Sequence, residues 1–204
     1  MTSQDIQMSS RSDELSVTSR ETVVVVGNGM VSHRLCETLR KEVGVERVRV
    51  LVFGEEPWPA YDRVQLTNYF DLASAAPLLL GTHAWYAERD IELHTGVRVD
   101  AVDLLRREVV TDRGERHAFD RLVLATGSAA FVPPVPGIGS EGVFVYRTLD
   151  DLDAIRAYAT KATRCAVLGG GLLGLEAARA VQRCGVEAHV VEMAPRLMPR
   201  QIDA

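Results

Sequence analysis

The sequence has few cysteines and no long apolar run, and each absence excludes a class of protein. Its 204 residues include three cysteines, Cys36, Cys165 and Cys184, which form no close pair. A secreted disulfide scaffold would need more, so we expect the protein in a reducing cytoplasm. No uninterrupted apolar stretch approaches the about 20 residues that a membrane-spanning helix requires. The sequence therefore predicts a cytoplasmic protein that does not cross a membrane.

Positive charge is also in the minority. The 23 Lys and Arg residues face 28 Asp and Glu residues, which gives a formal net charge of −5 and a pI of about 5.6. Nucleic-acid-binding proteins usually present a basic surface, so we expect no nucleic-acid partner. The five histidines are scattered without metal-ligand spacing, and no metal site is predicted. Hydrophobic content of 47% and charged content of 25% are ordinary for a globular protein.

The first twenty residues lack apolar periodicity. Residues 1–20 are rich in Ser, Thr, Asp and Gln, and they have neither the basic end nor the apolar centre of a secretory signal. Such a composition buries too little apolar surface to order the chain, so residues 1–20 are predicted to be a disordered tail. Met8 is an alternative start.

Order is predicted to begin at Glu21, with a first nucleotide-binding pattern. The β-branched run 22–26 reads as a strand buried on both faces of a parallel sheet. Gly27-Asn28-Gly29 follows at once, then a helical repeat that ends at Gly44, and then a second strand over residues 48–53. Strand, glycine turn, helix and strand in this order are typical of a dinucleotide-binding unit.

The residue types in the turn suit this chemistry. Gly27 permits a sharp turn, and Gly29 lets the backbone approach a pyrophosphate at the positive end of the following helix. The third position of the glycine pattern is Ser32, which weakens the match but is still small. An acid after the second strand can bind a ribose. Glu55 and Glu56 both lie further along than the usual ~20 residues after the glycines, so the choice between them stays open.

A second copy of the pattern is complete. The apolar strand 164–168 leads into Gly169, Gly171 and Gly174, followed by a helix that ends near Gly185 and a strand over residues 187–191. Two such patterns in one chain favour two nucleotide sites over two glycine turns in an unrelated α/β protein.

Glu192 stands at the tip of the last strand, at the expected distance from the second glycine turn. A carboxylate at this point accepts hydrogen bonds from the ribose hydroxyls and repels a 2′-phosphate, so NADH is favoured over NADPH. Arg196 follows four residues later and leaves NADPH open, unless it is merely a solvent-exposed side chain.

The region between the two patterns has a different character. Short strands are predicted at residues 91–94, 98–102 and 108–111, and a longer strand at 119–125 leads into Thr126 and Gly127. A proline-rich connector over residues 133–137 precedes a predicted helix over residues 149–159. The fold class is therefore α/β, with two Rossmann-like, three-layered units, of which the second is truncated. The predicted domains are a first, nucleotide-binding domain over 21–140 and an incomplete second one over 141–204.

Two glycine patterns that flank the segment Phe119 to Gly127 resemble the FAD/NAD(P)-dependent pyridine nucleotide reductases. Within that family, the chain resembles the amino-terminal flavin domain of the NAD(P)H-dependent assimilatory nitrite reductase large subunits. This likeness covers nearly everything after residue 20. It is carried by Val26 to Met30, Phe53 to Pro57, Tyr61 to Arg63, Trp85 to Glu88, Gly169 to Glu176, and Pro195 to Met198.

The resemblance implies that FAD binds the first unit and the nicotinamide cofactor the second. Arg63 is expected beside FAD, and the backbone of Val99 beside the adenine, although Val99 is equally well a core residue of its strand. Glu176 is a tentative catalytic residue near the nicotinamide and flavin rings, with an exposed helix residue as the alternative. The full cofactor-binding set is Gly27, Asn28, Gly29, Met30, Glu55, Glu56, Arg63, Val99, Ala125, Thr126, Gly127, Gly169, Gly171, Leu172, Leu173, Gly174 and Glu192.

The cysteine pair of the disulfide-reducing relatives is missing. The resemblance therefore implies hydride transfer from NADH to flavin N5 and delivery of electrons to an external acceptor, with no essential protein acid or base for the hydride step. That acceptor is an iron–sulfur or siroheme domain in the nitrite reductase reading. It is a small iron protein in the alternative, a ferredoxin- or rubredoxin-type reductase.

The sequence also lacks the further strands expected after Glu192, and it has no cysteine set for an iron–sulfur or siroheme centre. The chain is therefore expected to be a fragment, a split gene product or a truncated relative. An inactive nucleotide-binding remnant is a third functional alternative, beside the nitrite reductase module and the ferredoxin- or rubredoxin-type reductase. A homo-oligomer, or a second chain that completes the sheet, stays open.

Overall fold

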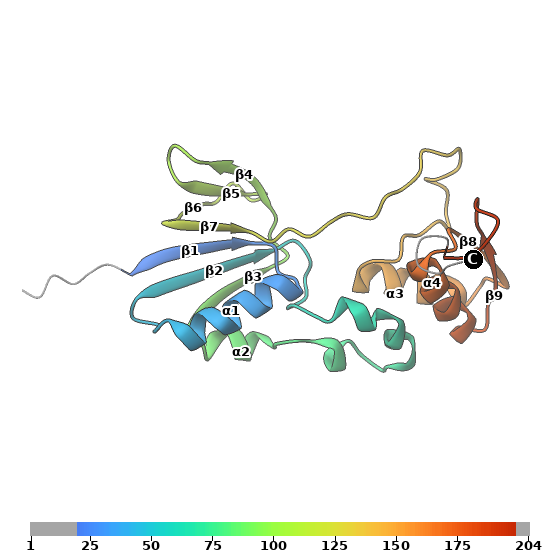
Figure 1. The fold of residues 1–204 in the computed structure, drawn as a ribbon, viewed down its shortest axis with the longest axis horizontal. Coiled ribbons are helices and arrows are strands. Elements are labelled where there is room, and N and C mark those ends of the chain that lie inside the picture. Colours follow the sequence, from blue (N-terminus) through green and yellow to red (C-terminus); the bar gives the residue numbers. More distant parts are fainter. Residues whose placement is uncertain (1–19, 199–204) are drawn as a thin grey trace, which may run out of the picture.

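The computed structural model describes residues 20–198, which form two bodies joined by two long connections (Figure 1). One connection runs through residues 55–82 and the other through residues 125–148. The predicted tail lies outside the described residues except for Arg20. The Arg20 side chain pairs with Asp90 and donates to the carbonyl oxygen of Val48 at 3.2 Å, so this residue is attached to the first body.

The first body is built on a four-stranded parallel sheet with the order β3-β2-β1-β7. Its central strands contain four fully buried valines, Val24, Val25, Val50 and Val52. The strands and the helix that connects the first two are β1 (Glu21–Val26), α1 (Met30–Glu42), β2 (Val48–Gly54), β3 (Ile91–Thr95) and β7 (Arg121–Leu124). The strand, glycine turn, helix and strand predicted from residues 22–53 are therefore present in that order.

Two strands that come later in the sequence, β3 and β7, form the edges of this sheet. β3 pairs with β2, with Phe53 opposite His94, and β7 pairs with β1, with Val26 opposite Leu124. Both segments lie between the two glycine patterns in the sequence and inside the predicted first domain, 21–140, but the sequence did not predict which strands they pair with. Strand pairing over such separations depends on tertiary contacts, and the local pattern of a short strand does not reveal its partner.

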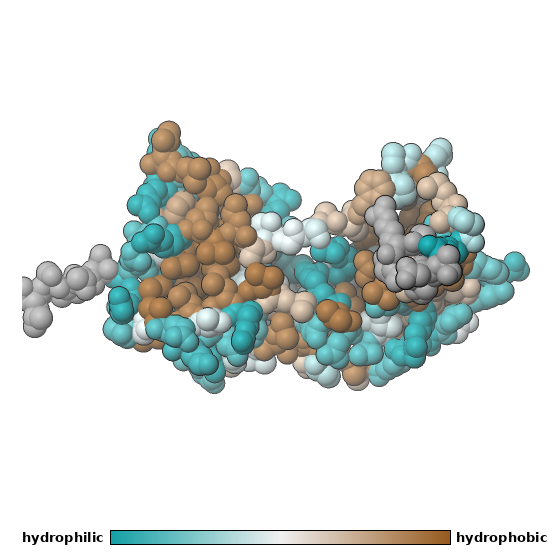
Figure 2. All heavy atoms as spheres, in the orientation of Figure 1, coloured by the Kyte–Doolittle hydropathy of each residue, from teal (hydrophilic) through white to brown (hydrophobic). Residues whose placement is uncertain are grey.

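Three layers form the first body. On one face of the sheet, the side chains of Val23 and Val25 pack with the layer of α1 and α2 (His83–Ala87). On the other face, Val24 and Val26 pack with an antiparallel sheet of order β4-β5-β6. This second sheet comprises β4 (Val99–Asp103), β5 (Glu108–Thr111) and β6 (Arg116–Ala118). Figure 2 shows apolar side chains gathered over this part of the first body.

A stack of rings joins the two sheets. Phe53 is 4.6 Å from the ring of His94 and 4.8 Å from that of His117, centroid to centroid. Burial and the neighbouring His117 lower the pKa of His94, and Arg49 acts in the same direction, while Glu92 and Glu115 oppose the shift. His94 is therefore neutral in the folded protein at a pH where it is already partly protonated in the unfolded chain.

We expect the stability of the protein to fall as the pH decreases through about 6.5, the ordinary pKa of histidine. The unfolded chain binds a proton at His94 that the folded protein does not, so stability rises with pH across this window. Urea unfolding at pH 7.5 and 5.5 measures the effect, and His94→Phe, which keeps a ring against Phe53, should reduce it. His189→Asn is the control, because the His189 side chain is 58% exposed. An equal pH dependence in all three proteins would contradict the assignment.

The second body contains α3 (Leu149–Ala159), β8 (Arg164–Leu168), α4 (Leu172–Arg183) and β9 (Glu187–Val191). The helix predicted over residues 149–159 is confirmed. Its start is fixed by a capping box, in which Thr148 and Asp151 exchange side-chain and backbone hydrogen bonds. β8 and β9 are parallel, with Leu168 opposite Val191. Exposure alternates along both strands, so one face of this pair is covered and the other is open.

The connection after β2 packs against the second body. It contains η1 (Arg63–Asp71) and η2 (Ala76–Leu78), and its Leu66 and Tyr69 belong to one hydrophobic cluster with Leu149 and Leu152 of α3. By sequence this segment lies inside the predicted first domain, 21–140. The domain boundaries themselves stay a prediction.

Candidate functional site

The first glycine turn packs tightly against the end of β7. Gly27 has a φ of +104°, which side chains rarely adopt, and its N–H donates to the carbonyl oxygen of Phe53 at 2.8 Å. A Cβ on Gly27 would collide with the Ala125 carbonyl group and would lie 2.9 Å from the Cα of Thr126. The structure therefore brings together Gly27, Ala125 and Thr126, three of the predicted site residues. Gly127, which follows directly, has a φ of +70°.

The helix after this turn opens without a side-chain cap. Gly29 is the N-cap of α1 and has no side-chain cap hydrogen bond, and among the described residues a Cβ on Gly29 would meet nothing within 4 Å. Free N–H groups at a helix start and the positive end of its dipole suit a phosphate. Met30 begins the helix and is 37% exposed, whereas Ser32 is fully buried, as expected for close packing at the third position.

Asn28 uses its side chain within the protein. Its Nδ2 donates to the carbonyl oxygen of Trp58 at 3.2 Å, and its Oδ1 accepts from the Tyr86 hydroxyl at 3.3 Å. Gly54 leaves room for it, because a Cβ there would lie 2.6 Å from the Asn28 Cβ. Asn28 thus holds the turn to two other segments. Trp58 and Tyr86 were not predicted as site residues, although Tyr86 lies in the segment Trp85 to Glu88 that carries part of the family resemblance.

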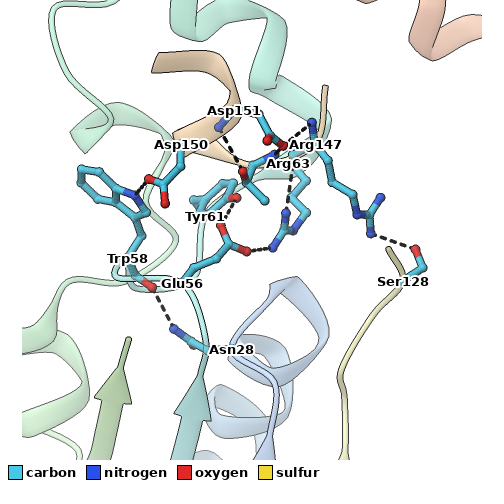
Figure 3. A network of polar contacts seen from close by, with 10 residues as sticks. Asn28, Glu56, Trp58, Tyr61, Arg63, Ser128, Arg147, Asp150 and Asp151 are labelled. Atoms are coloured by element: carbon cyan, nitrogen blue, oxygen red, sulfur yellow. Dashed lines mark hydrogen bonds and ion pairs between the residues drawn. The ribbon is translucent and has the colours of Figure 1, made fainter. Parts of the chain in front are cut away.

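The two acids after β2 have different surroundings. Glu56 is half-buried, forms an ion pair with Arg63, and accepts from the Tyr61 hydroxyl at 2.6 Å (Figure 3). Burial, together with the negative charge of Glu56, raises the pKa of Tyr61, so the hydroxyl stays a donor. Glu55 is exposed. The pair and the hydrogen bond occupy both oxygens of Glu56.

Arg63 connects the two long connections. Besides the pair with Glu56, its Nη1 donates to the carbonyl oxygen of Arg147 at 3.0 Å, and its guanidinium lies 4.8 Å from the ring centre of Tyr61. Arg147 in turn donates from Nη2 to Ser128 Oγ at 2.8 Å (Figure 3). The ends of the 128–147 segment are therefore tied to each other and to the loop after β2.

Val99 begins β4 close to that loop. The turn that precedes it is bound to the end of β2, because Gly96 N donates to the Glu56 carbonyl and Val97 N to the Gly54 carbonyl, both at 2.9 Å. Val99 is half-buried and packs against the core between the sheets. Its ladder with Thr111 is interrupted by a register shift before Ala101, which leaves the backbone irregular there.

The second glycine turn repeats the geometry of the first. Gly169 has a φ of +108°, and its N–H donates to the carbonyl oxygen of Val191 at 2.9 Å. Gly171 is the N-cap of α4 with no side-chain cap, and a Cβ there would meet no atom of residues 20–198 within 4 Å. A Cβ on Gly174 would lie 2.9 Å from the carbonyl carbon of Gly169, so this position requires glycine for packing. Leu172 and Leu173 are 55% and 62% exposed beside the turn.

Glu192 is fixed against this turn. One carboxylate oxygen accepts from Gly170 N at 2.6 Å and the other from Ala194 N at 2.8 Å. These backbone donors, first Ala194 and then Gly170, lower the pKa of Glu192, so the carboxylate is ionised at neutral pH. The carboxylate therefore lies directly against the backbone of the second glycine turn.

Glu176 lies on α4 and is half-buried. It is close enough to Tyr146 for its negative charge to raise the pKa of that tyrosine, although burial is the larger cause. Tyr146 also contacts η1, with its hydroxyl 3.1 Å from Thr67 Oγ1. Glu176 thus faces the connection between the bodies.

The described chain offers little room for other chemistries. Within residues 20–198, no group of three or more His, Cys, Asp and Glu side chains could hold a metal ion. No helix in the same range is long and apolar enough to cross a membrane. Burial raises the pKa of the Cys36 thiol to about 11, so this cysteine is a protonated core residue.

Comparisons with known proteins agree with this geometry. The family model described as "Pyridine nucleotide-disulphide oxidoreductase" matches residues 21–204. The chain is 49% identical over 185 residues to the nitrite reductase [NAD(P)H] large subunit of Klebsiella oxytoca, a match covering 91% of this chain and 19% of that protein. It is 33% identical to the benzene 1,2-dioxygenase system ferredoxin–NAD(+) reductase subunit of Pseudomonas putida, over 87% of this chain and 43% of that one.

Among solved structures, a ferredoxin reductase from Rhodopseudomonas palustris superposes with a TM-score of 0.81 at 28% identity, covering 89% of this chain and 45% of that one. The chain therefore spans about a fifth of the nitrite reductase subunit and less than half of each ferredoxin reductase.

Proposed function

The chain belongs to the pyridine nucleotide-disulphide oxidoreductase family, and on this basis we propose that it is an FAD-dependent module that oxidises NADH and passes the electrons onward. One observation carries the proposal. Each of the two glycine turns ends in an uncapped helix start where no atom of residues 20–198 fills the space beside the N-cap glycine. Two such cradles in one chain suit two dinucleotides.

FAD is assigned to the first turn. Gly27, Gly29 and Met30 would offer backbone to the pyrophosphate, with the 125–127 segment alongside and the Val99 backbone toward the adenine. Glu55 is the better ribose acid, because Glu56 already binds Arg63 and Tyr61 and Glu55 is exposed. Arg63 and Asn28 then hold the loops around the site in place through their hydrogen bonds within the protein.

The nicotinamide cofactor is assigned to the second turn. Gly169 and Gly171 would receive its pyrophosphate, with Leu172 and Leu173 at its rim and Gly174 required for the turn to close. The ionised Glu192 supports NADH over NADPH, because a 2′-phosphate would meet a fixed negative charge.

The bound flavin would supply the chemistry, accepting hydride from NADH and delivering electrons to an acceptor. The protein binds and orients both dinucleotides through its helix starts and glycine turns. Burial raises the pKa of Tyr61 and Tyr86, so both hydroxyls stay protonated and donate hydrogen bonds beside the first turn.

The relatives support two kinds of electron acceptor. We favour an iron–sulfur or siroheme centre, as in a nitrite reductase of nitrate assimilation, because the identity to that large subunit is the higher of the two. A ferredoxin-type reductase that serves a small iron protein is the second candidate, supported by the superposition with the Rhodopseudomonas protein. The domain limits 21–140 and 141–204, a cytoplasmic location and a complementing chain or homo-oligomer remain part of this proposal.

The test is a visible spectrum of the purified chain, followed by anaerobic addition of NADH. A flavin spectrum that bleaches supports the function. A colourless protein that takes up no FAD would instead indicate a nucleotide-binding remnant without this activity.

Glu176→Gln is expected to leave the rate of flavin reduction by NADH within about threefold of the unchanged protein. Hydride transfer needs no protein acid or base, and glutamine keeps the size and one acceptor oxygen of the side chain. Anaerobic stopped-flow absorbance measures this rate. Complete loss of reduction with NADH still bound would show that the carboxylate takes part in the step.

A further inference from the structure

Trp58 bridges the first glycine turn and the helix that precedes the second nucleotide turn. Its carbonyl oxygen accepts from Asn28 Nδ2 at 3.2 Å, and its indole Nε1 donates to Asp150 Oδ1 at 3.0 Å (Figure 3). Asn28 lies inside the first glycine turn, and Asp150 lies in the first turn of α3. A single residue therefore contacts both bodies of the protein.

The backbone around this residue is stiff. Pro57 and Pro59 flank Trp58, so φ is fixed on both sides, and Trp58 itself is restricted to extended conformations because a proline follows it. Pro59 and Ala60 are buried, and the Ala60 carbonyl accepts from Leu80 N at 2.8 Å. A displacement at one end of the segment is therefore transmitted to the other end.

Both ends of the bridge are anchored. Asn28 also accepts from the buried Tyr86 hydroxyl, which lies 3.1 Å from His33 Nδ1 on α1. At the other end, the capping box fixes the start of α3, and the Trp58 ring packs against the hydrophobic cluster that contains α3 side chains. Other hydrogen bonds and apolar packing therefore hold both partners of Trp58, Asn28 and Asp150, in place.

We propose that Trp58 and Asp150 are positioning residues that couple the two nucleotide sites. Their contact holds the second body in one orientation to the first glycine turn, so occupancy of one site alters affinity at the other. Such coupling is reciprocal, and each ligand changes the affinity of the other by the same factor. The identity of the two ligands rests on the function proposed above, whereas the contact itself does not.

The first experiment uses the protein without added nucleotide. Hydrogen exchange is followed by mass spectrometry in peptides that cover the start of α3 and residues 27–30, where the Gly27 amide is protected by its hydrogen bond to Phe53. Asp150→Ala and Trp58→Phe should each raise exchange at both places by about three- to tenfold, the range for loss of one modest hydrogen bond. In the double variant the effects should not add, because both substitutions remove the same contact.

Asp153→Ala is the matched control. It lies one turn further along α3 and loses a similar hydrogen bond, from the Tyr69 hydroxyl at 2.7 Å, but Tyr69 belongs to η1 and has no part in the bridge to Asn28. Its exchange should rise around η1 and stay unchanged at residues 27–30. Unchanged exchange at 27–30 in both Asp150→Ala and Trp58→Phe would overturn the proposal.

The second experiment measures the dissociation constant of NAD+ with and without FAD. The ratio of the two values should differ from one by at least threefold, and Trp58→Phe should bring it close to one. A ratio that Trp58→Phe leaves unchanged would also overturn the coupling. If the protein binds neither nucleotide, the proposed function fails, whereas the bridge is still decided by hydrogen exchange.

Discussion

Alanine at Gly27 is expected to abolish FAD retention and to lower the free energy of unfolding by roughly 3 kcal/mol or more. Two costs combine. A side chain is strained at a φ of +104°, and the added Cβ would collide with the backbone at Ala125 and Thr126, which cannot rotate away as a side chain could. Urea unfolding and FAD titration measure the two effects.

The substitution Gly29→Ala tests the space for the ligand without disturbing the packing of the protein. The backbone at Gly29 has an ordinary φ of −115°, and the new Cβ would meet no protein atom within 4 Å. The stability should therefore change by no more than about 1 kcal/mol, the usual range for an N-cap substitution. FAD affinity should still fall at least tenfold, because the methyl group occupies the space left for the pyrophosphate. Unchanged affinity would mean that the ligand does not approach there.

Local signals predicted the elements that carry both turns. A β-branched run, a glycine pair and a helical repeat place β1, α1 and β2 within one or two residues of the observed ends, and the α3 bounds of 149–159 are the predicted ones. These features depend on backbone freedom at glycine and on propensities that act within a few residues.

Local sequence patterns do not predict contacts between segments that are far apart in the sequence. The sequence left Glu55 and Glu56 equivalent, and only the pairing of Glu56 with Arg63 and Tyr61 distinguishes them. The packing of η1 (Arg63–Asp71) against α3 and α4, which begin only at Leu149, follows from a shared apolar cluster that no periodicity reveals. The role of Asn28 as a link to Trp58 and Tyr86 is of the same kind, because both partners depend on tertiary structure.

Glu192→Gln should reduce the preference for NAD+ over NADP+ by about tenfold to a hundredfold, as expected when one charge stops opposing a 2′-phosphate in a fixed site. Glutamine keeps the side-chain length and an acceptor for Gly170 N, so the turn should survive the change. The measurement is the ratio of dissociation constants for NAD+ and NADP+ in direct binding titrations. These need no turnover and therefore report on the second turn alone.

Glu187→Gln is the matched control, because it removes the same charge at the opposite end of β9, from a side chain that is 63% exposed. It should leave the preference unchanged, and an equal shift in both variants would assign the effect to net charge rather than to Glu192. The backbone donors that lower the pKa of Glu192 add a second expectation. The carboxylate should stay ionised below its ordinary pKa, so the affinity for NAD+, which carries no titrating 2′-phosphate, should be constant from pH 8 to pH 5. An affinity for NAD+ that declines within this window would show that the hydrogen bonds from Gly170 and Ala194 do not persist when the nucleotide is bound.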